Sequence, residues 1–163
     1  MKTTSFFLLL GSNQGNRQQQ LQTAIDHIEQ LIGVIEKKSS LYETAAWGKT
    51  DQSPFLNQAI LINSILTPTT LLLEIHAIEK KMGRKRIEKW GKRTIDIDIL
   101  FAEDLFLKTD ELKIPHPEIQ HRRFTLVALT EIAPDFVHPV LRKTNAQLLD
   151  DCLDQLSVVR FTN

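Results

Sequence analysis

The chain has 163 residues, of which 42% are hydrophobic and 25% are charged, as in a folded protein rather than a disordered one. Basic and acidic residues both number 20, so the net charge is zero and strong bulk attraction to nucleic acid or acidic membranes is not expected. This length fits one domain over residues 1–163. With one cysteine and no run near the roughly 20 apolar residues of a membrane helix, we expect a cytoplasmic protein.

The N-terminal segment predicts a strand followed by a helix. The apolar residues 5–10 are typical of a strand covered on both faces, and a Gly-Ser-Asn turn follows them. Leucine and isoleucine then recur at helical spacing over residues 17–32. We expect Ser12 or Asn13 to cap this helix and Gly33 to end it.

The middle of the chain predicts two more strands and a second helix. Residues 34–44 and 55–66 have strand patterns and are separated by a segment rich in turn-forming residues. Pro68 suits the first turn of a helix, with Thr67 as its cap and Gly83 at its end.

The C-terminal half begins with a basic segment, residues 84–93, which holds six cations and one glutamate. A strand is predicted over residues 95–101, and residues 105–107 suggest a partner strand after a turn. Two further helices are expected, over residues 122–132 and 146–156.

The order strand, helix, two strands, helix, strand is that of a ferredoxin-like fold. The sequence therefore predicts an α+β protein with a βαββαβ core. We expect a largely antiparallel sheet with helices packed on one face and additional C-terminal elements.

Residues 90–100, WGKRTIDIDIL, contain a strict alternation of isoleucine and aspartate. Successive side chains of a strand point to opposite faces, so Asp96 and Asp98 share the face opposite the isoleucines. Carboxylates on a well-buried strand are costly unless a metal ion, an arginine pair or a water-filled cleft meets them. The other interpretation is an edge strand with a solvated acidic face.

The basic segment leads directly into these aspartates, and the combination indicates phosphate chemistry. Mg²⁺ binds a few carboxylate oxygens together with water and substrate phosphates, and arginine donates two parallel hydrogen bonds to phosphate. The chain lacks the G-x-x-x-x-G-K-[ST] pattern of a P-loop. His76 and Glu79 share a helix face and could both point towards the basic segment.

The sequence resembles the 6-hydroxymethyl-7,8-dihydropterin pyrophosphokinase family. The resemblance is carried by an ordered set of motifs: GSNQGNR, PFLNQA, IEKKMGRKR, WGKRTIDIDIL, IPHPEIQHRRF and EIAPDF. It implies the transfer of pyrophosphate from ATP to the hydroxymethyl group of a reduced pterin, with release of AMP, in folate biosynthesis.

The resemblance also implies roles for individual residues. Asp96 and Asp98 would bind two Mg²⁺ ions and, with Arg93 and Arg86, form the catalytic group. The expected ATP-binding residues are His76, Glu79, Lys85, Lys89, Trp90, Arg93, His116 and Arg122. The expected pterin-binding residues are Thr44, Ala46, Phe55, Asn57 and Phe124. Phe55 and Phe124 would stack on the pterin and Asn57 would read its polar edge.

The sequence departs from the family pattern at three positions. Lys89 replaces a familiar arginine, and Glu111 and Lys113 stand where some relatives have nucleotide-contacting Arg and Thr, so Glu111 and Lys113 are left out of the expected site.

Two other functions stay open: a nucleotidyltransferase, which also uses paired aspartates, and a ferredoxin-like RNA-binding module. The expected partners are ATP and the pterin, with no nucleic acid and no membrane, and we expect a monomer.

Overall fold

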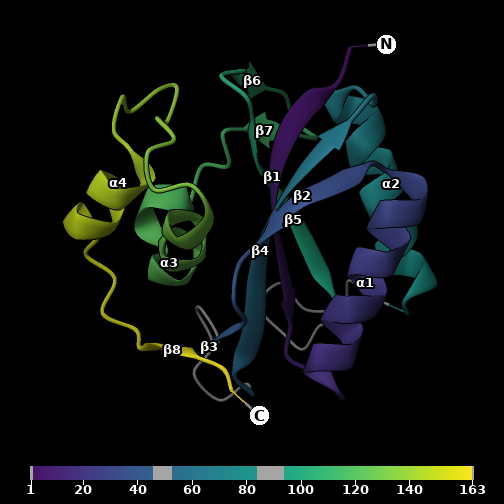
Figure 1. Ribbon diagram of the computed structural model, residues 1–163, viewed down its shortest axis with the longest axis horizontal. Helices are drawn as coiled ribbons and strands as arrows, with labels where there is room; N and C mark the ends of the chain where they lie inside the picture. Colours follow the sequence, from purple (N-terminus) through teal and green to yellow (C-terminus); the bar gives the residue numbers. More distant parts are fainter. Residues whose placement is uncertain (1, 46–52, 84–93, 163) are drawn as a thin grey trace.

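The computed structural model describes residues 2–45, 53–83 and 94–162. A central sheet separates two layers of helices (Figure 1). The elements in chain order are β1 Thr4–Ser12, α1 Arg17–Leu31, β2 Val34–Lys38, β3 Tyr42–Thr44, β4 Phe55–Ser64, α2 Pro68–Lys81, β5 Asp96–Ala102, β6 Leu107–Lys108, β7 Lys113–Ile114, the 3₁₀ helix η1 Ile119–His121, α3 Arg123–Ile132, α4 Asn145–Asp151 and β8 Val158–Arg160.

The main sheet has the order β5-β1-β4-β3-β8, and β2 pairs with β4 beside β3. All its pairings are antiparallel. With β2 and β3 counted as one interrupted strand, this is the βαββαβ arrangement, and the prediction of a ferredoxin-like α+β fold is confirmed. None of the helices in the described ranges is long and apolar enough to cross a membrane.

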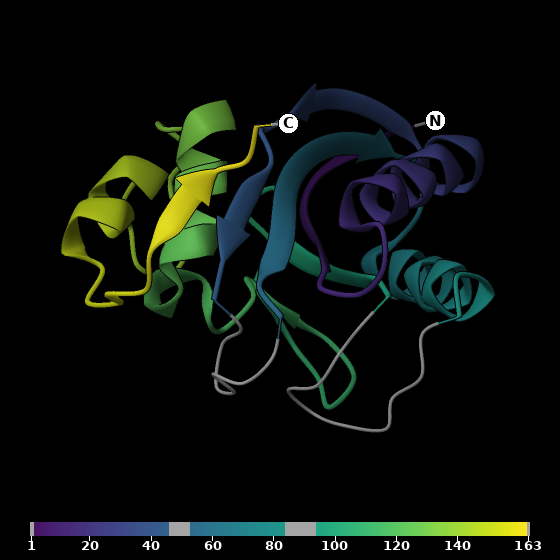
Figure 2. The ribbon, with the colours of Figure 1, turned by 90° about the horizontal axis from the view of Figure 1, so that it is seen from below.

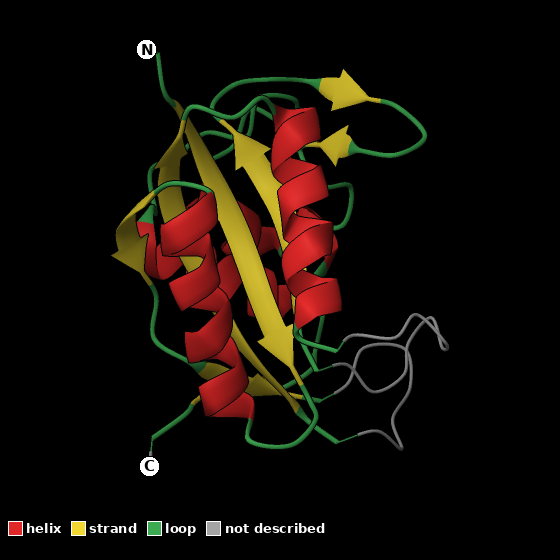
Figure 3. Ribbon diagram, turned by 90° about the vertical axis from the view of Figure 1, so that its right-hand side faces the viewer, coloured by secondary structure: helices red, strands yellow, loops and turns green. Residues whose placement is uncertain are grey.

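Two apolar clusters hold the layers together, one on each face of the sheet. Alternate β1 residues Phe6, Leu8 and Leu10 pack under α1 and α2, which lie side by side over that face (Figure 3). Phe7 and Leu9 point the other way, into the cluster that contains α3 and α4. The expectation of helices on one face holds for α1 and α2 but is wrong for the C-terminal helices. Because β1 is apolar on both faces, it needs cover on both.

The start of α1 differs from the prediction. Asn16, not Ser12 or Asn13, caps the helix, and its side chain accepts a hydrogen bond from the Gln19 backbone N–H at 3.1 Å. The strand β1 includes Gly11 and Ser12, two of the three residues expected to form a turn, so the turn lies later, where Gly15 adopts a φ of 66°.

Gly33 follows the end of α1 as predicted, but for a different reason. A Cβ atom at this position would lie 2.1 Å from the backbone oxygen of Asn63 in β4. Gly33 therefore permits close approach of the chain to the neighbouring strand, whereas a helix-ending glycine usually supplies a positive φ.

Three other predicted elements need correction. Residues 34–44 form two strands, β2 and β3, which both pair with β4. Between them Ser39 stays bonded to β4, because its backbone N–H donates to the Ala59 carbonyl oxygen at 2.8 Å and its side-chain oxygen accepts from the Ala59 N–H at 2.9 Å. Leu107 pairs with Ile114 in a small separate sheet and not with β5. The expected helix 146–156 ends at residue 151, and residues 158–160 form β8 at the outer edge beside β3 (Figure 2).

Candidate active site

Strand β5 separates aspartates from isoleucines as the alternation predicts. Ile97 and Ile99 belong to the apolar cluster under α1 and α2. Asp96 and Asp98 lie on the opposite face, where both line a cavity. The register places Asp98 opposite Leu9 on the neighbouring strand β1.

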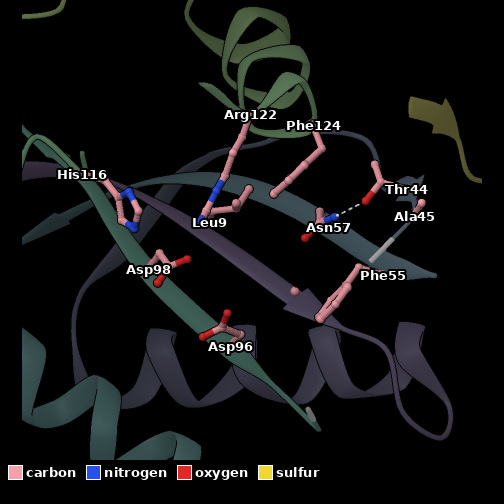
Figure 4. Close-up of a pocket in the computed structure, with 11 residues that line it drawn as sticks. Leu9, Thr44, Ala45, Phe55, Asn57, Asp96, Asp98, His116, Arg122 and Phe124 are labelled. Carbon is pink, nitrogen blue, oxygen red and sulfur yellow. Dashed lines mark hydrogen bonds between the residues drawn. The ribbon is translucent and has the colours of Figure 1, made fainter. Parts of the chain in front are cut away.

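This first cavity collects residues from four strands and from α3 (Figure 4). Asn57 of β4 lies between Phe55 of the same strand and Phe124, which reaches down from α3. The lining residues are Leu9, Gly11, Thr44, Ala45, Phe55, Asn57, Asp96, Asp98, His116, Arg122 and Phe124. The structure thus brings two aromatic rings, an amide and two carboxylates to one concave site.

A hydrogen bond orients Asn57 within the cavity. Its side-chain Nδ2 donates to Thr44 Oγ1 at 3.2 Å, and both residues are buried. Since the amide nitrogen faces Thr44, the oxygen faces Gly11, where a Cβ atom would lie 2.7 Å from it. Thr44 was expected among the pterin-binding residues, and its side chain has the role of holding the Asn57 amide.

A second cavity lies beside the first and shares Asp96, Asp98 and His116 with it. His76 and Glu79 of α2 line this cavity, as the prediction of a common site requires. The complete lining is Leu72, His76, Glu79, Asp96, Ile97, Asp98, Ile99, Asp110, Glu111, Leu112, Lys113, His116 and Pro117. The paired aspartates therefore stand where the two cavities meet.

The carboxylate of Glu79 contacts the backbone of β5. Glu79 is 3% exposed, and it accepts a hydrogen bond from the Ile97 backbone N–H at 2.8 Å. Ile97 lies between the two aspartates, and β5 is at the edge of the sheet. This bond satisfies a backbone donor that an edge strand leaves without a strand partner. Glu79 thus fixes the segment of β5 that carries Asp96 and Asp98.

His116 is neutral near pH 7. Burial, reinforced by the positive charge of Arg122, lowers the pKa of His116 to about 4, against the opposing effects of Glu118 and Asp96. Its Nδ1 accepts a hydrogen bond from the Glu118 backbone N–H at 3.1 Å. The neutral ring therefore carries its proton on Nε2, which makes that nitrogen a hydrogen-bond donor.

The aspartate pair suits a magnesium ion by its chemistry. Asp96 and Asp98 are partly buried and share one strand face. Mg²⁺ takes one or two carboxylates from a protein and fills its other positions with water and substrate phosphates. Within the described ranges, no three or more His, Cys, Asp or Glu side chains are grouped to hold a metal. Binding of two Mg²⁺ ions stays a prediction.

Several predicted residues lie outside the described part of the chain: Ala46, Lys85, Arg86, Lys89, Trp90 and Arg93. Arg122, which was expected at the nucleotide, lines the first cavity. Glu111 and Lys113, which were left out of the expected site, line the second.

Sequence reasoning missed Gly11, Leu9 and Ala45 as lining residues. The sequence predicts Gly11 in a turn, but it lies in β1 between its partners Asp96 and Asn57. A glycine inside a strand signals close approach of another group, and that signal could have identified it.

Comparison with known proteins places this chain in a family. The family model for 7,8-dihydro-6-hydroxymethylpterin-pyrophosphokinase matches residues 7–134. The chain is 44% identical over 137 residues to the 2-amino-4-hydroxy-6-hydroxymethyldihydropteridine pyrophosphokinase of Aquifex aeolicus, covering 84% of this chain and 85% of that one. It is 43% identical to the protein of the same name from Synechocystis, over 88% of this chain and 74% of the relative.

Solved structures agree on the fold. A crystal structure of Plasmodium falciparum HPPK-DHPS superposes with a TM-score of 0.77 at 22% sequence identity, covering 92% of this chain and 45% of that one. The family match extends from β1 to the end of α3 and includes the residues quoted above for both cavities. The chain belongs to the 7,8-dihydro-6-hydroxymethylpterin-pyrophosphokinase family.

Proposed function

We propose that this protein transfers the pyrophosphate group of ATP to the hydroxymethyl group of 6-hydroxymethyl-7,8-dihydropterin, releasing AMP, in folate biosynthesis. Family membership supports the reaction. The observation that carries the site assignment is the sharing of Asp96, Asp98 and His116 by two adjacent cavities. We assign the pterin to the first cavity and the nucleotide to the second.

The first cavity suits a flat heteroaromatic ring. Phe55 and Phe124 come from different elements and supply two apolar faces, and aromatic rings favour offset-stacked or edge contacts with such a ligand. Asn57 can offer hydrogen bonds to the polar edge of a pterin, because an amide carries both donors and an acceptor. The bond to Thr44 means that the amide is oriented before the ligand arrives.

The second cavity has groups suited to a phosphate chain. His116, which lines both cavities, presents a neutral Nε2–H donor, and Arg122 in the adjacent first cavity lies near enough to lower the pKa of His116. Asp96 and Asp98 would hold Mg²⁺, and bound Mg²⁺ neutralises charge on the phosphates and on the attacking oxygen. Glu79 keeps the aspartate-bearing strand in place through the Ile97 amide. We expect Arg93, Arg86, Lys85 and Lys89 to contact the transferred phosphates, and His76 and Trp90 to contact the nucleotide.

The reaction products test this function directly. The purified protein is incubated with ATP, Mg²⁺ and 6-hydroxymethyl-7,8-dihydropterin, and the products are separated by chromatography. We expect AMP and a diphosphorylated pterin in equal amounts. Free pyrophosphate with a nucleotide–pterin adduct would instead identify a nucleotidyltransferase, and no product in the presence of Mg²⁺ would contradict the proposal.

A further inference from the structure

Arg17, the first residue of α1, lines neither cavity but contacts chain segments at the rim of the first. Its guanidinium Nη2 lies 2.6 Å from Glu43 Oε2, and its Nη1 donates to the Pro54 carbonyl oxygen at 3.0 Å. The same guanidinium lies over the ring of Phe161, 5.6 Å from the ring centroid. One side chain therefore joins α1 to three segments distant in sequence.

The two polar partners of Arg17 each precede a cavity residue. Glu43 comes directly before Thr44, and Pro54 comes directly before Phe55. Thr44 and Phe55 face each other in the β3–β4 pairing. A displacement of Glu43 or Pro54 would thus be transmitted to the residue that orients Asn57 and to one of the two aromatic walls.

A second contact reinforces the same junction. Asn13, which is 3% exposed, donates from Nδ2 to the Ser53 carbonyl oxygen at 3.3 Å. Asn13 and Arg17 both belong to the GSNQGNR segment, from which Gly11 also lines the first cavity. The segment from Asn13 to the first residue of α1 is therefore bonded to the chain just before β4 at two successive carbonyl groups, those of Ser53 and Pro54.

Arginine is suited to this position by its shape. The planar guanidinium presents donors in a fixed fork, so it can bind a carboxylate and a carbonyl at once while its face lies on an aromatic ring. The Arg17 side chain is 22% exposed and that of Glu43 is 39% exposed, so solvent screens the pair and its contribution to global stability is small. The role considered for Arg17 is therefore the placement of Thr44 and Phe55, and not a contribution to the free energy of unfolding.

We propose that Arg17 is a positioning residue for the pterin pocket, joining the ends of β3 and β4 so that Thr44 and Phe55 keep their places around the ligand. This inference rests on the proposed function, because it assumes that the first cavity takes the pterin. It assigns Arg17 an effect on pterin binding and none on the nucleotide, because Thr44 and Phe55 line the first cavity and not the second.

Steady-state kinetics with each substrate varied in turn test the inference. For Arg17→Ala we expect the KM for the pterin to rise about tenfold, while the KM for ATP and the melting temperature stay close to the wild-type values. Arg17→Lys should recover less than half of the loss, because an ammonium group cannot reproduce the fork. Glu43→Gln is a second variant, which removes the charge of the partner and keeps its size, and it should raise the pterin KM by a smaller factor.

The control is Lys143→Ala, which removes the Lys143–Asp151 ion pair, 2.7 Å long and remote from both cavities. It should leave both KM values within twofold of wild type. A pterin KM for Arg17→Ala within twofold of wild type, or equal losses for both substrates, would overturn the inference. If Arg17→Ala fails to fold, the same criteria apply to Glu43→Gln. Failure of the wild-type protein to form AMP would instead overturn the proposed function.

Discussion

The two faces of the central sheet are built from the same strands but differ in what covers them. On one face, α1 and α2 complete an apolar cluster that includes Leu8, Ile60 and Ile97. On the other face, α3 and α4 cover the end of the sheet where Phe7 packs against Phe101 and Phe136, with ring centroids 5.9 Å and 5.0 Å away. The rest of that face carries the cavity with Asp96, Asp98 and Asn57 (Figure 4).

The residues that stabilise the fold and the residues of the candidate active site therefore lie largely on opposite faces of the sheet. Burial of apolar side chains is the main driving force for folding, and the α1–α2 face supplies it continuously. Carboxylates and amides would be costly under such a cover, because burial without partners penalises polar groups. Asp96, Asp98 and Asn57 lie instead on the face that carries the cavity. The buried Glu79 on the α2 side is compensated by its hydrogen bond from the Ile97 amide. Substitutions on the covered face should therefore alter unfolding, and substitutions on the open part should alter turnover.

The largest effect is expected from Asp98→Ala. Loss of one carboxylate of the pair should lower kcat on the order of 10³-fold, since phosphoryl transfer is catalysed mainly by positioning and by stabilisation of charge on the phosphates. The free energy of unfolding should stay near the wild-type value, because two neighbouring carboxylates repel each other. Steady-state AMP formation and urea unfolding measure the two quantities. Asp104→Ala, in the exposed turn after β5, is the control and should leave kcat and the free energy of unfolding unchanged. Near-normal turnover of a folded Asp98→Ala protein would contradict the assignment of Asp98 to the active site.

The reverse pattern is expected from Ile75→Ala on α2. Ile75 is fully buried in the cluster under the helices, and its truncation should reduce the free energy of unfolding by about 2–5 kcal/mol. Both KM values should stay unchanged at temperatures where the variant is folded. Leu73→Ala on the same helix serves as the control, because Leu73 is 63% exposed and should lose less than about 0.5 kcal/mol. Equal losses for the two variants in urea unfolding would remove the distinction.

Substitution of alanine for Gly33 and for Gly11 tests the same contrast between stability and ligand binding. In Gly33→Ala, the new Cβ would meet a backbone oxygen of β4 at 2.1 Å, and the strand would have to shift, which should cost about 2–3 kcal/mol. In Gly11→Ala, the Cβ would meet the side-chain oxygen of Asn57 at 2.7 Å. That side chain can move, so we expect a loss below about 1 kcal/mol.

The cost of Gly11→Ala should appear in ligand binding instead. Displacement of the Asn57 amide should raise the KM for the pterin about tenfold, which corresponds to about 1.4 kcal/mol. Urea unfolding and pterin kinetics on both variants provide the comparison, and each protein is the control for the other. A pterin KM raised more by Gly33→Ala than by Gly11→Ala would contradict the division between the faces.

The parts predicted from sequence are those set by local pattern. The alternation around Asp96 and Asp98 depends only on the period of a strand, and the apolar stripe of α1 only on the period of a helix. These two signals, with the chain order, were sufficient for the ferredoxin-like core. The C-terminal strand β8 was missed because its pairing with β3 is a long-range contact, and leucines at 149, 153 and 156 imitate a helical face.

The candidate site also contains residues that local spacing predicts and residues that it does not. Strand alternation alone placed the two aspartates together, whereas the grouping of Phe55 with Phe124 came from the family resemblance. Their proximity depends on how α3 packs on the sheet, which no local spacing records. The bond between Asn57 and Thr44 depends on the register of β3 against β4, which is also invisible in a single sequence.

The smallest effect on the free energy of unfolding is expected from a change at Glu131, which joins α3 to Ser40 and to Tyr42 of β3. Its carboxylate accepts hydrogen bonds from the Ser40 backbone N–H at 3.0 Å and from the Tyr42 hydroxyl at 2.5 Å. Burial alone would raise the pKa of Glu131, but the bonds from Tyr42 and Ser40 outweigh it and lower that pKa. Because the group is exposed, Glu131→Gln should reduce the free energy of unfolding by only about 1 kcal/mol at pH 7.

The pH dependence of that difference identifies its cause. A carboxyl whose pKa is lower in the folded state contributes stability above its unfolded pKa, here 4.5, and loses it as the pH falls through the folded value. The gap between wild type and Glu131→Gln in urea unfolding should therefore narrow from pH 7 to about pH 3, while other carboxyls titrate alike in both proteins and cancel. Glu29→Gln on α1, also exposed, should show a small gap at every pH. A gap that widened at low pH would mean that the ionised Glu131 carboxylate does not stabilise the contact between α3 and the segment of Ser40 and Tyr42.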